Sequence, residues 1–411
     1  MKFSLVILSN LLALALGQTG FLPPIAEPCD NTSLPRILCI NNYAAVMPYP
    51  FFRPVSSLRN DYDFGATSVP NDPSFLLVNQ SDFLVFDRDR GLRLLGPKPS
   101  LTIVFNVTQS IHEAPVYVAS QNKLYLSQLP PPYGFLPQLV IDLNQDPPTI
   151  SEFLSDPPVY AANGGTFHRG LIYWGASGGV DDVGGMEQRV DIRTVDPVTK
   201  KSTTILNNYF GNYFNNIDDL FVHPNGDVWF TDPDYGYFGN LTMTPPQLPA
   251  ATYRFRPSTG AVHLVEDTLT QPNGIALSPC NRTVYISDSG ALNGDISPTS
   301  ARGIGYNQTG KRAIYAYDLS HDATHLTNKR AIYLAEDFIP DGLKVARNGY
   351  VVTAAGKGVD VLDKTGTLLV RVRTDFPVQN FAWAGRKLRT LWLTGTGAVA
   401  KVEWNLQGQV L

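Results

Sequence analysis

The sequence has few charged residues, few cysteines and histidines, and no long uninterrupted apolar segment. Charged residues make up 17% of its 411 residues, with 32 Lys+Arg, 36 Asp+Glu and a net charge of -4. This small net charge, without a block of like charges, argues against a nucleic-acid or anionic-membrane binder. No later segment reaches the roughly 18 apolar residues of a transmembrane helix. Six histidines and three cysteines without zinc-ligand spacing disfavour a zinc site.

The N-terminus has the pattern of a secretory signal peptide. Met1-Lys2-Phe3 carries one positive charge, and an apolar run from Leu5 to Leu16 ends at Gly17. We therefore expect residues 1–17 to be removed and the protein to be secreted to the extracellular space. Six Asn-x-Ser/Thr sequons fit a glycoprotein with N-linked glycans at some of these sites. They lie at Asn31, Asn79, Asn106, Asn240, Asn281 and Asn307.

An oxidising compartment also bears on the three cysteines. Cys29 and Cys39 lie ten residues apart, and a disulfide between them is plausible in a secreted chain. Cys280 is then left over. It lies in a turn without a His or a cationic neighbour in the sequence that would make its thiol reactive, and its state stays open.

One pattern recurs from about residue 100 onward: a turn rich in Gly, Asn or Pro, an aromatic or β-branched strand, and a small or acidic residue at the strand's end. The copies are separated by about 40 to 66 residues, the scale of a four-stranded propeller blade with variable loops. The six copies lie at 121–127, 168–174, 224–232, 280–288, 347–353 and 386–394.

These repeats predict an all-β fold, a single six-bladed β-propeller with an N-terminal extension. Long helical periodicity is hard to find. We expect the extension to cover residues 18–70 and the propeller to cover 71–411, with Ser74 to Phe86 supplying the strand that closes the ring. A seven-bladed ring is the structural alternative.

A polar residue precedes the apolar strand at the start of four blades. Because the innermost strands of a propeller line its central channel, equivalent positions should converge on the axis. Three carboxylates and one carboxamide would then form a cluster of hard oxygen ligands that suits Ca²⁺, and suits Mg²⁺ or Mn²⁺ less well. Carboxylates facing one another would repel without a cation. The four residues are Glu113, Asp218, Asn273 and Asp341.

Four further side chains are candidates for the reaction or for substrate binding. His112 would point away from Glu113 if both lie on one strand, and could act as acid or base if the strand starts at Glu113. Asn163, Asp219 and Tyr235 are candidates for substrate contacts, although core packing is an alternative for Tyr235. Asp232 and Asp288 end strands, and we expect them to cap turns or bridge blades.

The motifs around these residues resemble the gluconolactonase, senescence-marker-protein and regucalcin family. The resemblance covers roughly residues 100 to 405, is nearest to secreted fungal lactonohydrolases, and rests on three segments taken together. It implies a six-bladed propeller with one catalytic divalent cation at the channel mouth, and hydrolysis of lactone esters. The segments are Asp218-Asp219-Leu220 through Gly236, Pro272-Asn273-Gly274 through Asp288, and Pro340-Asp341-Gly342-Leu343.

The resemblance carries specific roles to specific residues. Glu113 matches the acidic ligand of the first blade, Asn273 the Pro-Asn-Gly ligand, and Asp341 the Pro-Asp-Gly ligand that is proposed also as the base. The chain departs from the pattern at Asp218-Asp219, where many bacterial members have Asn-Asp. This change adds a negative charge, which should tighten cation binding and weaken the cation's Lewis acidity.

The resulting hypothesis is a secreted, calcium-dependent lactonase. The metal would polarise the lactone carbonyl, and a water activated by Asp341, or by Glu113 or His112, would attack it. No Gly-x-Ser-x-Gly elbow is present. A paraoxonase-like aryl ester or phosphotriester hydrolase, and a non-catalytic calcium-stabilised binding propeller, are the alternatives. The sequence leaves open whether the substrate is an aldonolactone, pantoyl lactone or a larger macrolactone.

Overall fold

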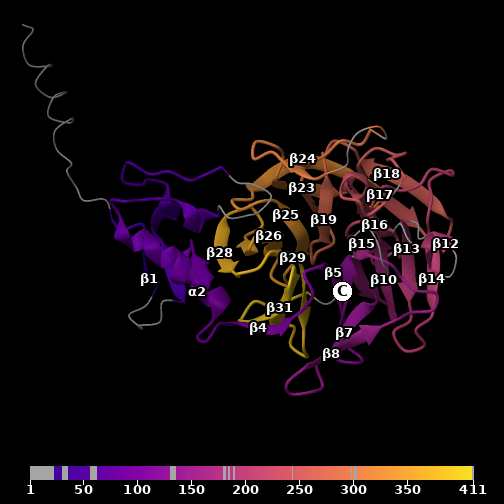
Figure 1. Cartoon of the computed structure of the whole chain (residues 1–411), viewed down its shortest axis with the longest axis horizontal. Coiled ribbons are helices and arrows are strands. Elements are labelled where there is room, and N and C mark those ends of the chain that lie inside the picture. Colours follow the sequence, from indigo (N-terminus) through magenta and orange to yellow (C-terminus); the bar gives the residue numbers. More distant parts are fainter. Residues whose placement is uncertain are drawn as a thin grey trace, which may run out of the picture.

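The computed structural model describes most of the chain from residue 23 onward. The described residues are 23–29, 36–55, 63–129, 136–178, 182–183, 186–187, 190–242, 244–297, 299 and 303–409. The signal peptide expected over residues 1–17 and the sequon at Asn31 lie outside these ranges. In Figure 1 most strands are arranged around a common centre, as expected of an all-β propeller.

Five of the sheets among the described residues have four antiparallel strands. The first contains β5 (Ile111–Val118), β6 (Lys123–Leu129), β7 (Gln138–Asp142) and β8 (Thr149–Phe153). The second contains β9 (Ala162–His168), β10 (Leu171–Ala176), β13 (Asp191–Val195) and β14 (Ser202–Leu206). The third contains β15 (Leu220–Val222), β16 (Val228–Asp232), β17 (Ala251–Arg256) and β18 (Ala261–Glu266). The fourth contains β19 (Pro272–Leu277), β20 (Thr283–Asp288), β23 (Ala313–Leu319) and β24 (Leu326–Leu334).

The sheet that closes the propeller combines three strands from the C-terminal part of the chain with one strand that precedes the first sheet. It contains β29 (Val378–Ala384), β30 (Thr390–Gly395), β31 (Ala398–Glu403) and, paired antiparallel to β31, β4 (Ser100–Asn106). The prediction that Ser74 to Phe86 closes the ring is therefore wrong. That segment forms the 3-10 helix η3 (Pro73–Gln80) and the short strand β3 (Phe83–Val85), and β3 pairs with a different sheet.

The remaining large sheet has seven strands. Its strands β25 (Pro340–Val345), β26 (Val351–Ala355), β27 (Gly358–Leu362) and β28 (Leu368–Arg373) are followed by β3, β2 (Ile37–Ile40) and β1 (Ala26–Pro28). The prediction of a six-bladed propeller is thus corrected to five four-stranded blades, because β3 pairs with the outer edge of β28 and extends this sheet to seven strands. Pairing an exposed edge in this way protects it from other chains.

All six sequence repeats form the second strand of a sheet, namely β6, β10, β16, β20, β26 and β30. The turn at Asn225-Gly226 illustrates the local cause. Gly226 has φ +93°, and the Asn225 side chain accepts a hydrogen bond from the Asp227 amide at 2.9 Å, so the dipeptide reverses the chain directly before β16. The aromatic residues that follow pack between sheets, where Trp174 and Trp229 are fully buried.

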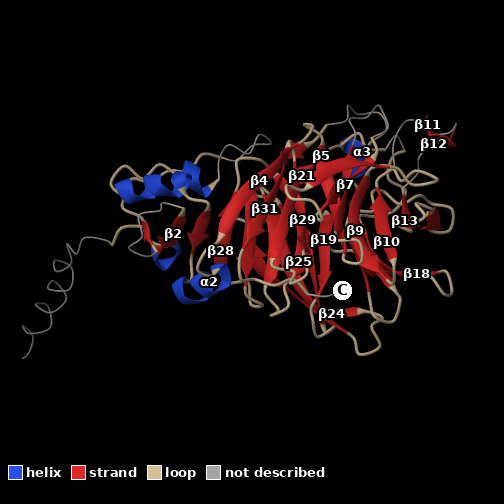
Figure 2. Cartoon of the chain, turned by 90° about the horizontal axis from the view of Figure 1, so that it is seen from below, coloured by secondary structure: helices blue, strands red, loops and turns tan. Residues whose placement is uncertain are grey.

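The N-terminal part forms a layer on one side of the seven-stranded sheet (Figure 2). The predicted disulfide between Cys29 and Cys39 is present and joins β1 to β2. Cys280 is exposed. Helix α2 (Arg88–Leu95) starts at an Asp87 cap and leads into β4. Two short 3-10 helices, η1 (Asn41–Ala44) and η2 (Phe64–Ala66), complete the layer.

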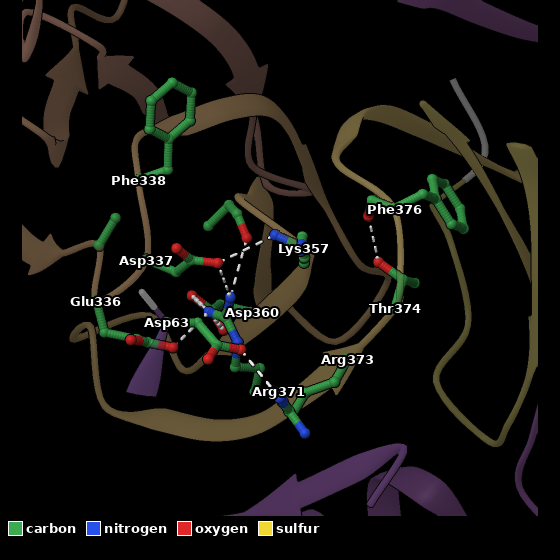
Figure 3. Close-up of polar contacts among 12 residues, drawn as sticks. Asp63, Glu336, Asp337, Phe338, Lys357, Asp360, Arg371, Arg373, Thr374 and Phe376 are labelled. Atoms are coloured by element: carbon green, nitrogen blue, oxygen red, sulfur yellow. Dashed lines mark hydrogen bonds and ion pairs between the residues drawn. The ribbon is translucent and has the colours of Figure 1, made fainter. Parts of the chain in front are cut away.

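A buried arginine forms ion pairs at the middle of the seven-stranded sheet (Figure 3). The guanidinium of Arg371, on β28, donates to Asp360 Oδ1 at 2.9 Å and to Asp337 Oδ2 at 3.0 Å. The neighbouring Arg373 donates to Asp63 Oδ2 at 3.0 Å, which ties the N-terminal layer to the same strand. Because each buried charge has opposite charges beside it, the cluster avoids the cost of burying unpaired carboxylates.

The long loops contain small elements of their own. Hairpin β11 (Asp182–Val183) with β12 (Met186–Glu187) lies between β10 and β13, and hairpin β21 (Leu292–Asn293) with β22 (Gly305–Tyr306) lies between β20 and β23. The one-turn helix α3 (Tyr235–Phe238) lies between β16 and β17. None of the described helices combines the length and the apolarity that crossing a membrane requires.

Candidate active site

Six polar residues lie at the starts of the innermost strands and form a ring around the axis. The innermost strands β5, β9, β15, β19, β25 and β29 contact one another in this order, and β29 contacts β5. Each ring residue lies on one of these strands or directly before it, and five of them are at most 4% exposed, whereas Asp341 is partly exposed. The ring residues are Glu113, Asn163, Asp218, Asn273, Asp341 and Asn380.

Irregular strand pairing turns these side chains out of the sheets. The register of β5 with β6 breaks after Glu113, that of β19 with β20 breaks after Pro272, and that of β25 with β26 breaks after Pro340. A bulge adds a residue to one strand and redirects its side chains. The regular alternation of a strand is therefore interrupted where the ring residues lie.

Glycine follows several ring residues because a Cβ at that position would clash with a neighbouring ring residue. A Cβ on Gly164 would lie 2.0 Å from the Asp218 backbone oxygen, and one on Gly274 would lie 2.5 Å from the Asp341 backbone oxygen. A Cβ on Gly342 would lie 2.5 Å from the side chain of Asn380. Each Asn-Gly or Asp-Gly pair thus combines a ring residue with the close approach of the next ring residue.

We expect Gly274→Ala to destabilise the protein by about 1–3 kcal/mol, the usual cost of overpacking a well-packed interior. It should also lower turnover, because β19 and β25 would separate and move Asn273 relative to Asp341. Gly303→Ala is the matched control, since a Cβ there meets no atom within 4 Å. Thermal unfolding and turnover of both variants check this. Equal behaviour of the two variants would contradict the steric explanation.

Paired Ser/Thr-Asp residues at strand ends link neighbouring sheets to the ring. The Thr231 hydroxyl donates to the Asn273 backbone oxygen at 2.6 Å, and the Ser287 hydroxyl donates to that of Asp341 at 3.0 Å. The adjoining Asp232 carboxylate accepts from the Asn215 and Asn216 amides, and Asp288 accepts in the same way from residues 270 and 271. The predicted structural role of Asp232 and Asp288 is therefore confirmed.

Burial and mutual repulsion favour protonation of the ring carboxylates. Desolvation, followed by the charge of Asp341, raises the pKa of Glu113 well above its usual value. The same two causes raise the pKa of Asp218. Desolvation raises the pKa of Asp341 to about 7, against a hydrogen bond from the Asn273 side chain that lowers it. The charges of the neighbouring carboxylates thus add to desolvation in raising the pKa of Glu113 and Asp218.

The ring offers oxygen atoms that have no protein partner. Asp218 Oδ2 and Asn273 Oδ1 are buried and lack a hydrogen bond among the described residues. Over the same ranges, no three His, Cys, Asp or Glu side chains are grouped so that they could hold a metal ion. The donor set that fits a hard cation therefore includes a carboxamide, and its carboxylates would have to converge to hold one.

Tyr235 lies beside two ring residues. Its hydroxyl oxygen is 3.4 Å from Asn163 Nδ2 and 3.4 Å from Asn273 Nδ2. Asn273 Nδ2 is also 3.4 Å from Ser289 Oγ. The amide group of Asn273 is thus engaged through its nitrogen, and Oδ1 has no hydrogen-bond partner among the described residues.

Asp219 and His112 take different positions from Asp218 and Glu113. Asp219 has no exposed surface, pairs with Lys344 Nζ at 3.2 Å, and accepts from the Leu220 amide at 2.9 Å. His112 is fully buried, and its Nδ1 lies 3.0 Å from the Gly395 backbone oxygen. The two side chains are thus engaged inside the protein, whereas Tyr235 is partly exposed.

The chain can now be compared with known proteins. The family described as SMP-30/Gluconolactonase/LRE-like region matches residues 156–397. The chain belongs to this family. The assignment confirms the resemblance that the motifs indicated.

Relatives of this SMP-30/gluconolactonase member agree over most of its length. The lactonohydrolase oryL of Aspergillus oryzae (strain ATCC 42149 / RIB 40) is 45% identical over 393 residues, which cover 94% of this chain and 90% of oryL. A solved gluconolactonase from Xanthomonas campestris has a TM-score of 0.62 at 23% identity and covers 78% of this chain and 94% of its own. The calcium-binding protein regucalcin from Agrobacterium tumefaciens has a TM-score of 0.52 at 13% identity and covers 75% and 94%. The two solved structures show likeness of fold alone.

Asn380 is the ring residue of this family member that sequence reasoning missed. It lies on β29, and its side chain donates a hydrogen bond that lowers the pKa of Glu113 against the larger effects of burial. The sequence signal is Val378-Gln379-Asn380 before the apolar Phe381-Ala382. No glycine follows Asn380, so it lacks the Asn-Gly or Asp-Gly pair that marks Asn163, Asn273 and Asp341.

The innermost strands of the SMP-30/gluconolactonase fold continue past the ring into an apolar cavity of about 170 Å³. Val116, Phe221 and Trp383 line it, and Lys344 is its charged residue. The segment that ends the described chain crosses one side of it, where Gln409 Nε2 donates to the Leu277 backbone oxygen at 3.1 Å. The polar ring and the apolar cavity thus follow each other along the same strands.

Proposed function

We propose that the protein is a calcium-dependent lactonase that hydrolyses the ester bond of a lactone to the hydroxy acid. It is a hydrolase acting on carboxylic ester bonds, as its named lactonohydrolase and gluconolactonase relatives are. The observation that carries the finer proposal is the ring itself, in which three repelling carboxylates lie beside buried oxygens that lack partners. A bound cation would relieve that repulsion.

We infer that the seven-stranded sheet serves as a sixth blade. Its strands β25 to β28 pair in the same antiparallel order as those of the other sheets, and β25 contacts both β19 and β29. Asp341 on β25 then takes the same place in its sheet as Asn273 on β19. We retain residues 18–70 as an extension and 71–411 as the propeller, with the extension adding strands to the sixth blade.

Glu113, Asp218, Asn273 and Asp341 would hold the cation. When bound, it supplies Lewis acidity at the carbonyl oxygen. Asp341 takes a proton from the attacking water as a general base, a role that a positioned carboxylate can fill. Asn163 contacts the substrate, and Asp219 keeps the ring in place through Lys344. His112, next to Glu113 in the sequence, is held inside the protein by its contact with the Gly395 backbone oxygen.

A panel of substrates tests the proposed function. We expect the chain, supplied with calcium, to open an aldonolactone, pantoyl lactone or an aromatic macrolactone faster than it cleaves a linear aryl ester or a phosphotriester. Acid release measured at constant pH reports the rate for each. Preference for the aryl ester or phosphotriester would replace the proposal with that chemistry, and no turnover of any of them would indicate a binding propeller.

We also propose that the protein is secreted and glycosylated. This rests on the apolar N-terminal run and on sequons that are exposed in the structure at Asn106, Asn281 and Asn307. Endoglycosidase treatment of protein from a eukaryotic secretory host should lower its mass by several glycans. A host that lacks N-glycosylation provides the control, and an unchanged mass would contradict the proposal.

A further inference from the structure

Tyr235 places a hydroxyl group between two residues of the ring. Its oxygen lies 3.4 Å from the side-chain nitrogens of Asn163 and of Asn273, which belong to different sheets. Tyr235 is partly exposed, so this residue lies at an accessible side of the site.

The position of Tyr235 is fixed by the segment around it. The Asp234 amide donates to Gln271 Oε1 at 3.1 Å, and the Gln271 side chain donates back to Asp234. A Cβ on Gly236 would lie 2.8 Å from the Asn215 backbone oxygen. Residues on both sides of Tyr235 are therefore held against the segments that carry Asp218 and Asn273, which gives the hydroxyl a defined place.

The direction of the two hydrogen bonds decides what the hydroxyl can do. Both Asn side chains donate through nitrogen to the Tyr235 oxygen, and a phenolic oxygen can accept two bonds while it donates one. Its own hydrogen therefore does not point at either amide. It is available to a substrate atom at the ring.

We propose that Tyr235 is the general acid that protonates the leaving oxygen of the lactone. This inference rests on the proposed lactonase function. As the tetrahedral oxyanion collapses, the bond from the former carbonyl carbon to the ring oxygen breaks and its electron pair stays on that oxygen. The oxygen takes the proton of the Tyr235 hydroxyl, and the chain opens as the hydroxy acid.

The proton balance closes over one turnover. The attacking water gives its hydroxide to the carbonyl carbon and its other proton to Asp341. Tyr235 is left as a phenolate, and solvent carries a proton from Asp341 back to it. The amides of Asn163 and Asn273 stabilise the phenolate, because hydrogen bonds to a charged acceptor are stronger than those to a neutral one.

Two substrates with different leaving groups test the proposal. In glucono-δ-lactone the leaving oxygen is an aliphatic alkoxide, whose conjugate acid has a pKa near that of water, about 15.7. In dihydrocoumarin it is a phenolate, whose conjugate acid has a pKa of about 10. Tyr235→Phe should lower kcat/KM for glucono-δ-lactone by about 10² to 10⁴, the range for an acid catalyst, and that for dihydrocoumarin by only a few-fold.

Calcium affinity and folding complete the measurement. Tyr235→Phe should bind calcium as the wild type does and unfold at a similar temperature. Tyr237→Phe, on the same helix, is the matched control and should hydrolyse both substrates at close to the wild-type rates. Equal losses on both substrates, or weakened calcium binding, would reduce Tyr235 to a positioning residue and overturn the proposal. A wild-type chain that opens neither substrate would instead contradict the proposed function itself.

Discussion

Asp341→Asn is expected to lower turnover by about 10² to 10⁴ at saturating calcium, the usual contribution of a general base. Asp341 is partly exposed at the ring, so its carboxylate is accessible to the water that attacks the substrate. The Asn side chain keeps an oxygen ligand but cannot accept that proton. Calcium affinity should therefore fall much less than turnover. Steady-state kinetics over a calcium titration separate the two effects.

Asn273→Asp is the contrasting variant for Asp341→Asn. It adds a charge without removing a base, so calcium should bind at least as tightly.

Without metal, Asp341→Asn should raise the unfolding temperature, because one of the repelling carboxylates is gone. Near-normal turnover of Asp341→Asn once calcium is raised would show that Asp341 is only a ligand. The base would then have to be sought at Glu113, Asp218 or His112.

Glu113→Gln is expected to affect calcium affinity first. Loss of partners outside the ligand shell typically costs 10- to 100-fold in metal affinity, so we expect a loss of at least about 100-fold when a ligand carboxylate itself is neutralised. Turnover should recover in large part as calcium is raised, because Asp341 is still present. Calorimetric titration with calcium and the calcium dependence of the rate give the two values.

Glu152→Gln controls for a general effect of charge on calcium binding. Glu152 is exposed on β8, the strand of the same sheet that is farthest from β5. It should leave affinity unchanged. A Glu113→Gln chain that binds calcium as tightly as wild type would remove Glu113 from the ligand set.

The sequence predicted the features that depend on short segments. The second strand of each sheet follows a turn such as Asn225-Gly226, where the local conformation and the strand pattern agree. Asn273 and Asp341 were likewise recognised from short motifs, Pro-Asn-Gly and Pro-Asp-Gly, that recur at the start of a strand. In the structure the glycine of each motif allows the close approach of the next ring residue. Such features can be predicted from the sequence because a short motif is enough to identify each of them.

Features that depend on distant pairing were not predicted. β4 and β31 are separated by almost the whole propeller, and three-residue strands such as β3 carry little pattern, so the sequence did not reveal which strand closes the ring or which covers β28. The pairing of Asp219 with Lys344 links residues 125 positions apart. The orientation of the Tyr235 hydroxyl towards two different sheets is likewise a property of the assembled ring.

The central claim is that a cation held by this ring is required for lactone hydrolysis. It is tested most directly by the rate at which metal-free wild-type protein opens an aldonolactone as calcium is added back. We expect negligible turnover without metal, recovery that saturates at one calcium per chain, and a parallel rise in unfolding temperature, since a ligand that binds the folded state stabilises it. Full turnover in verified metal-free protein would contradict the account.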